Sequence, residues 1–156
     1  MQRITPCLWF DTQAEEAARF YVSLFDDAEV TDVRHLDGTP SGDNVALVFF
    51  RLEGLAYTAI NGGPQFPFTE AVSFSVSCPD QAEVDRLWNA LTADGGEEGQ
   101  CGWLKDRFGL SWQIIPDRMG ELLGDPDPER AGRAMQAMLK MRKIDVRALE
   151  DAAAAA

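Results

Sequence analysis

The sequence predicts an α+β fold of two tandem βαβββ units followed by a C-terminal helical extension. The first observation is the order of elements, because a strand, a helix and a meander of strands occur twice along the chain. The second is a match between the two passages. Glu16–Leu24 aligns with Glu83–Leu91 at an offset of 67, and Gly54–Asn61 aligns with Gly109–Pro116 at an offset of 55. One such unit cannot bury both faces of its sheet, so we expect the halves to share an interior as one structural domain.

The first unit, residues 1–63, begins with a short strand and a helix. Ile4–Phe10 has the composition of a strand. Asp11 or Thr12 is expected to cap a helix that runs to about Leu24, because apolar side chains recur behind it at helical spacing. A loop dense in turn formers, Asp37–Asp43, separates two of the three strands that follow. These strands are expected at Ala28–Leu36, Asn44–Leu52 and Leu55–Ile60.

The second unit, residues 64–117, repeats this order, and the tail, residues 118–156, is expected to be helical. Pro79–Asp80 opens the helix of the second unit. In the tail, Asp127 followed by Pro128 predicts a helix start and Asp145 predicts another, while Ala152–Ala156 is expected to fray. The strands are expected at Ala71–Ser77, Gln100–Lys105 and Leu110–Ile115, and a helix at the start of the tail at Asp117–Leu123.

Composition narrows the range of partners. The chain is 46% apolar and carries a net charge of −12, so it can bury a core but repels phosphates. We therefore expect no nucleic-acid or membrane partner, and no segment is apolar for long enough to span a bilayer. Three cysteines without a C-x-x-C pair, and an N-terminus without a signal-peptide pattern, predict a reduced, cytoplasmic protein.

Several stretches between the N-terminus and about Leu149 have a combination of residues typical of one superfamily. They are Ile4–Phe10, Ala14–Tyr21, Ile60–Pro64, Ser73–Val76, Cys101–Asp106, Phe108–Pro116 and Lys143–Asp145. Together they resemble the glyoxalase/bleomycin-resistance (vicinal oxygen chelate) superfamily, and more specifically its PhnB-like subfamily. That subfamily also carries the label 3-demethylubiquinone-9 3-methyltransferase-like.

The resemblance implies that each unit forms a strongly curved mixed sheet, that the sheets enclose a cleft, and that homodimers are common. In the superfamily's metalloenzymes, four strand residues hold one divalent ion, and the corresponding positions here are Pro6, Thr58, Ser73 and Gln113. Proline offers no ligand atom, hydroxyls are weak ligands, and only Gln113 offers an amide oxygen. We therefore expect the superfamily's fold without its metal site and without a cofactor.

Alternation along the strands predicts which side chains face the cleft if those four positions point into it. Trp9, Tyr57, Phe74 and Trp112 then point toward the helices. The lining suits a small neutral or partly apolar molecule and offers no charge, although its polar groups could instead bond one another with no ligand. The candidate ligand-binding residues are Thr58, Ser73, Ser75, Ser111, Gln113, Leu8 and Phe10, with Trp103 at the mouth.

Two classes of function are compatible with this pattern. A metal-independent protein that binds a small molecule is favoured, because strong metal ligands and a convincing acid–base pair are both missing. The alternative is a lyase, isomerase or dioxygenase of the superfamily. A methyltransferase is the weaker third reading, because the first strand runs into Asp11–Ala14 without a glycine-rich turn. The sequence decides neither the ligand, nor whether catalysis occurs, nor the role of His35.

The tail predicts a homodimer. Its helices carry large apolar side chains that need a partner surface, on their own domain or on a second subunit. We expect a two-fold dimer, the commonest closed assembly, with the tail at or beside the interface. Exchange of the tail between subunits is left open. The side chains concerned are Ala131, Met135, Met138, Leu139, Met141, Val146 and Leu149.

Overall fold

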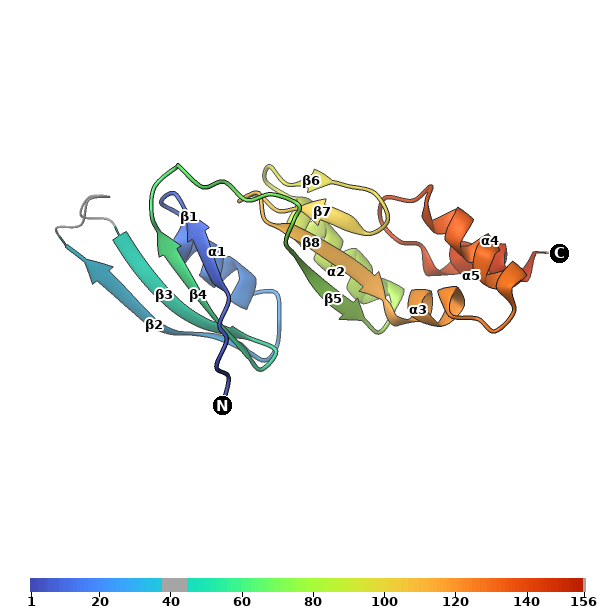
Figure 1. Cartoon of the computed structure of the whole chain (residues 1–156), viewed down its shortest axis with the longest axis horizontal. Helices are drawn as coiled ribbons and strands as arrows, with labels where there is room; N and C mark the ends of the chain where they lie inside the picture. The colour runs from blue at the N-terminus through green and yellow to red at the C-terminus, as the bar shows by residue number, and fades with distance from the viewer. Residues whose placement is uncertain (38–44, 156) are drawn as a thin grey trace. The chain divides into compact units, whose positions relative to one another are not determined.

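A computed structural model describes residues 1–37 and 45–155, so most of the predicted loop Asp37–Asp43 lies outside the described residues. The chain divides into two compact units, Met1–Phe68 and Thr69–Ala156, which are taken in turn (Figure 1). Each unit contains a strand, a helix and three further strands, so the predicted α+β fold of two βαβββ units is confirmed. Within the described ranges, no helix is long and apolar enough to cross a bilayer.

The first unit forms a four-stranded mixed sheet. Its elements are β1 (Cys7–Phe10), α1 (Ala14–Val22), β2 (Ala28–Leu36), β3 (Val45–Leu52) and β4 (Leu55–Asn61). The strand order is β1-β4-β3-β2, with β1 parallel to β4 and the other neighbours antiparallel. These elements match the predicted ones closely, except that β1 begins three residues later than expected.

The helix α1 covers one face of this sheet. Tyr21 of α1 packs on Phe50 of β3, and Phe50 stacks on Tyr57 of β4 with ring centroids 5.4 Å apart. Residues 64–68 belong to this unit because two of their rings pack on β1. Phe66 lies edge-on to Trp9 at 5.0 Å, and Phe68 lies edge-on to Phe10 at 5.2 Å.

The start of α1 differs from the prediction. Neither Asp11 nor Thr12 caps the helix, and the N-cap residue Gln13 makes no side-chain capping bond. The backbone N–H of Ala14 instead donates to Oδ1 of Asn61, the last residue of β4, at 2.7 Å. The side-chain amide of Asn61, on a distant strand, therefore accepts a hydrogen bond at the start of α1. We had expected a residue next to the helix to play this part.

The second unit repeats the same arrangement. Its sheet elements are β5 (Ser73–Cys78), α2 (Gln81–Thr92), β6 (Glu97–Glu98), β7 (Trp103–Lys105) and β8 (Ser111–Pro116), in the strand order β5-β8-β7-β6. Asp80 caps α2 as predicted, accepting a hydrogen bond from the Glu83 N–H at 2.9 Å. Figure 1 shows α2 lying along one face of this sheet, where Leu87 and Trp88 are buried.

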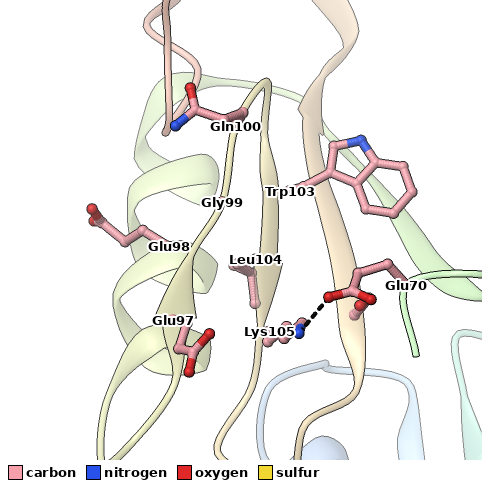
Figure 2. Close-up of a pocket in the computed structure, with 9 residues that line it drawn as sticks. Glu70, Glu97, Glu98, Gly99, Gln100, Trp103, Leu104 and Lys105 are labelled. Carbon is pink, nitrogen blue, oxygen red and sulfur yellow. Dashed lines mark ion pairs between the residues drawn. The ribbon is translucent and has the colours of Figure 1, made fainter. Parts of the chain in front are cut away.

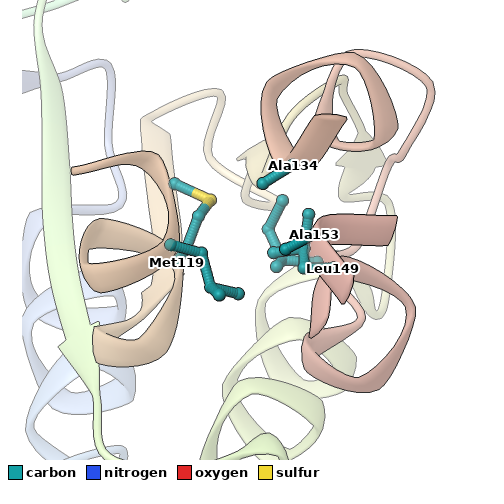
Figure 3. Close-up of a cluster of buried hydrophobic side chains, with 6 residues drawn as sticks. Met119, Ala134, Leu149 and Ala153 are labelled. Atoms are coloured by element: carbon teal, nitrogen blue, oxygen red, sulfur yellow. The ribbon is translucent and has the colours of Figure 1, made fainter. Parts of the chain in front are cut away.

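Three further helices form a small core in the tail. They are α3 (Asp117–Leu123), α4 (Pro128–Met138) and α5 (Val146–Ala154), and Asp127 and Asp145 cap the last two as predicted. Figure 3 shows Met119 of α3 pointing toward Leu149 and Ala153 of α5. The buried members of this core are Met119, Leu122, Ala134, Ile144, Leu149 and Ala153.

The expected fraying of Ala152–Ala156 is wrong for most of the segment. The helix α5 continues to Ala154, and Ala153 is 1% exposed. The Arg133 guanidinium donates to the carbonyl oxygens of Ala152 and Ala153, at 3.2 and 2.8 Å. These bonds satisfy carbonyl groups near the helix end that otherwise lack partners, and so they hold the last turn.

The tail docks on the second unit. The N–H groups of Cys101 and Gly102 donate to the carbonyls of Met141 and Arg142, each at 2.8 Å. Gly102 has φ of +85°, and a side chain there would meet Ile115 and Ile144 at about 3.1 Å or less. The apolar groups that led us to expect an intersubunit contact therefore pack largely within their own chain. Of the large ones in the tail, Met135 and Leu139 are exposed.

Candidate functional site

The second sheet has a core face and a polar face. Trp112 and Ile114 of β8 are buried on the side of α2. The register places Ser73 beside Ser111 and Ser75 beside Gln113, and it pairs Gln113 with Trp103 and Ser111 with Lys105. Paired residues share a face of the sheet, so these six side chains lie together opposite α2. We call this side the pocket face; its residues are Ser73, Ser75, Trp103, Lys105, Ser111 and Gln113.

The register agrees with the predicted alternation for Ser73, Ser75, Ser111 and Gln113, and Trp103, which we expected at the mouth, lies on the same face. Their roles in ligand binding stay predictions. Gln113 and Ser73 bond each other, because Nε2 of Gln113 donates to Oγ of Ser73 at 2.9 Å. Ser111 is different: the residue is 1% exposed, and its buried hydroxyl has no hydrogen-bond partner among the described residues. A buried hydroxyl without a partner is uncommon and calls for an explanation.

A pocket of about 390 Å³ opens at one end of the pocket face. Of the predicted residues it contains Ser111 and Trp103, whereas Ser73, Ser75 and Gln113 lie on the same face outside its lining. Figure 2 shows the Glu70 carboxylate reaching Lys105, with the Trp103 ring close by. The lining residues are Glu70, Glu97, Glu98, Gly99, Gln100, Trp103, Leu104, Lys105 and Ser111.

This pocket carries charge, unlike the lining that we expected for the cleft. Lys105 on β7 forms an ion pair with Glu70, which precedes β5. The hydrogen bond from Lys105 lowers the pKa of the Glu70 carboxyl, and the same bond raises the pKa of the Lys105 ammonium. Lys105 stands two residues after Trp103, so the alternation that selected Trp103 could also have found it. Glu70 lies outside any strand or helix, and no pattern marked it.

Two further carboxylates stand at the edge of the pocket on β6. Oε1 of Glu98 accepts a hydrogen bond from the buried indole of Trp88 at 2.9 Å, and its other oxygen lies 3.6 Å from Arg142. Glu98 therefore bonds to the core side of the sheet, through the indole of Trp88. Glu97 is paired with Lys105 in the register, so its side chain lies on the same side of the sheet as the pocket face.

Asp106 fixes the turn that brings Lys105 and Ser111 together. Its buried carboxylate accepts three hydrogen bonds: Oδ1 from the N–H groups of Phe108 and Leu110, and Oδ2 from Nε1 of Trp112 at 2.9 Å. Such charge-assisted bonds hold the ends of β7 and β8 in one arrangement. The part that Asp106 plays was not identified from the sequence.

In the first unit, the predicted positions of Leu8 and Phe10 are wrong. Leu8 pairs with Ala59, and Phe10 pairs with Asn61, on the face that packs against α1, and their exposures are only 6% and 3%. Trp9, expected in that core, lies on the opposite face together with Thr58.

The cause is a difference of one residue between the two repeats. Cys7 stands beside Thr58 as Ser75 stands beside Gln113, which gives the first strands an offset of 68. The helices keep the offset of 67, since Tyr21 and Trp88 are both buried. A shift of one residue exchanges the two faces of a strand, so taking Pro6 as the counterpart of Ser73, at an offset of 67, reversed the side chains of β1.

The four positions that correspond to metal ligands are divided between the units. Thr58 makes a long contact of 3.5 Å with the carbonyl oxygen of Pro6, and Gln113 is bonded to Ser73. Among the residues that the structure describes, no group of three or more His, Cys, Asp or Glu side chains could hold a metal ion. A metal-free site stays a prediction.

Comparison with known proteins identifies relatives. The family model described as 3-demethylubiquinone-9 3-methyltransferase matches residues 2–115. The structure of the PhnB protein of Bacillus cereus, which carries the same methyltransferase description, is 32% identical, with a TM-score of 0.68 over 74% of this chain and 99% of its own.

Two further structures show likeness of fold alone. A protein from Pseudomonas aeruginosa is 24% identical, with a TM-score of 0.56 over 75% of this chain and 100% of its own. The fosfomycin resistance protein FosX of Listeria monocytogenes is 17% identical, with a TM-score of 0.53 over 80% of this chain and 98% of its own. No curated protein matches the chain.

Proposed function

The chain belongs to the PhnB-like family of the vicinal oxygen chelate superfamily, whose family model is described as 3-demethylubiquinone-9 3-methyltransferase, and from this premise we propose that it binds a small organic molecule. The proposed site is the pocket between Glu70, Trp103, Lys105 and Ser111. Its volume of about 390 Å³ is within the range of small-molecule sites, near the lower end, which suits a compact ligand.

The Ser111 hydroxyl is the observation that supports this proposal most. It is buried, has no partner among the described residues and lines the pocket. An unsatisfied buried hydroxyl costs about 1–3 kcal/mol, and a ligand that bonds to it recovers that cost. Trp103 adds an aromatic surface for the apolar part of such a ligand. The ligand is therefore small and partly apolar, with at least one polar atom for Ser111.

The test is a titration of isotope-labelled full-length protein with a set of small aromatic fragments, followed by NMR. Binding at the proposed site shifts the Trp103 indole and the Ser111 amide, and Ser111→Ala weakens it. The matched control is Ser77→Ala, which removes an exposed hydroxyl from β5. Fragments that bind without shifting Trp103, or that bind Ser111→Ala as tightly as the unaltered chain, contradict the proposal.

The methyl transfer named in the family description is not part of this proposal. β1 is followed by Asp11–Gln13, with no glycine-rich turn of the kind that receives a nucleotide-like cofactor at a helix start. An enzymatic role of another kind stays an alternative.

The homodimer and the cytoplasmic location also stay predictions. The tail contributes Met135 and Leu139 as exposed apolar groups, with 39% and 51% of their surface accessible. Light scattering on the full chain tests the dimer, and a monomeric mass at micromolar concentration contradicts it. Replacing Met135 and Leu139 by glutamate tests whether the tail contributes to the dimer interface. An unchanged dimer in this variant means that these two residues do not.

A further inference from the structure

We infer that the ligand of this pocket presents an uncharged oxygen acceptor, such as a ketone, ester or amide carbonyl, and that Glu70 and Glu97 exclude anions from it. The inference rests on the proposed function and names the class of molecule that the site takes. It follows from two properties of the pocket, the hydrogen-bonding groups it offers and the charges around them.

Two neighbouring groups of the pocket, the Ser111 hydroxyl and the Lys105 ammonium, offer hydrogen-bond donors. The Ser111 hydroxyl is buried and has no partner among the described residues, so its proton is free for a ligand. Lys105 is paired with Ser111 in the strand register. Its ammonium has three N–H groups and forms an ion pair with Glu70 on one side. A ligand atom that lies between these two residues is therefore an acceptor.

The charges around these donors cancel the attraction that Lys105 would have for an anion. The Glu70 carboxylate is paired with the Lys105 ammonium, and Glu97 is opposite Lys105 on the neighbouring strand. Within the described part of the chain Glu97 has no ion-pair partner of its own. One cation thus stands between two carboxylates, and the whole chain carries a charge of −12. Donors without net positive charge select a neutral acceptor.

The apolar part of the ligand is placed by Trp103. This residue is two positions before Lys105 on β7, so both side chains extend from the same face of the strand. Figure 2 shows the Trp103 ring on the side of the strand where Glu70 meets Lys105. A ring or short chain attached to the carbonyl can therefore lie along the indole while the oxygen faces Ser111.

Three probes with the same ring separate the possible classes: acetophenone, benzoate and benzylammonium. NMR titration of the full chain is expected to show acetophenone shifting the Trp103 indole and the Ser111 amide. Benzoate is expected to bind at least about tenfold more weakly, the factor that corresponds to 1.4 kcal/mol. Equal or tighter binding of benzoate or benzylammonium overturns the inference.

A gain of function gives the second test. The variant Glu70→Gln with Glu97→Gln leaves Lys105 without its two carboxylates, so benzoate binding is expected to rise to that of acetophenone or above. The control is Glu16→Gln with Glu129→Gln, which changes the net charge equally outside the pocket. No gain for benzoate, or the same gain in the control, overturns the role of Glu70 and Glu97.

The failure of this inference can be told apart from the failure of the proposed function. If none of the three probes shifts Trp103 but other fragments do, the site binds small molecules and the assignment to carbonyl compounds is wrong. If no fragment of any class shifts Trp103 or Ser111, the proposed function is wrong as well.

Discussion

Replacing Asp106 by asparagine removes one hydrogen bond from the turn that supports the pocket. The amide can keep Oδ1 toward the N–H groups of Phe108 and Leu110, but its NH2 group then faces Nε1 of Trp112 across 2.9 Å. Two donors then meet where a carboxylate oxygen accepted a hydrogen bond, so the bond from the buried indole to residue 106 is lost.

The expected loss of stability follows from these contacts. A hydrogen bond to a charged group contributes about 1.5–3 kcal/mol, and the two backbone bonds weaken when the acceptor becomes neutral. We therefore expect Asp106→Asn to lower the free energy of unfolding by about 2–4 kcal/mol. In Trp112→Phe the opposing donor is absent, so the double variant should lose less than the sum, with a coupling of about 1–2 kcal/mol.

The assay is urea unfolding followed by circular dichroism, with the midpoint and the slope compared among the three variants and the unaltered chain. The control is Asp94→Asn, an exposed carboxylate 3.2 Å from Arg107, for which a change below about 0.5 kcal/mol is expected. A loss below about 0.5 kcal/mol for Asp106→Asn, or strict additivity with Trp112→Phe, would refute the account of this turn.

Three other predictions concern the tail and the chemistry of the chain. Leu149→Ala, in the core of the tail, should lower the free energy of unfolding by about 2–5 kcal/mol, and a loss under about 1 kcal/mol would show that the tail core is not packed as described. Elemental analysis of the purified protein should find no stoichiometric divalent metal; about one ion per chain, lost in Gln113→Ala, would contradict this. S-Adenosylmethionine should give no heat of binding in calorimetry, and micromolar affinity would restore the methyltransferase reading.

Local patterns predicted the parts of the fold that local contacts stabilise. Asp80, Asp127 and Asp145 cap helices through N–H groups within three residues, so the sequence around each was sufficient. The start of α1 depends on Asn61, which is 47 residues away, and no pattern near Ala14 indicates that contact. The same holds for the ion pair between Lys105 and Glu70.

The face of the candidate residues agrees with the structure where strand alternation was applied within the second unit. Ser111 was selected because it alternates with Gln113 on one strand, Trp103 was expected at the mouth, and both line the pocket. Leu8 and Phe10 were selected because they alternate with Pro6, the position that the resemblance aligned with Ser73, and a single extra residue in the connection reversed them. A side-chain period of two makes strand faces sensitive to such shifts.

The response of the Trp103 indole to acetophenone, in the unaltered chain and in Ser111→Ala, tests the central claim most directly. The account predicts a saturable shift in the unaltered chain and about tenfold weaker binding in Ser111→Ala. It also predicts that Ser111→Ala without ligand is as stable as the unaltered chain or more so, because an unpaired buried hydroxyl has been removed. Equal binding by both proteins, together with a loss of stability in the variant, would show that Ser111 supports the fold rather than a ligand.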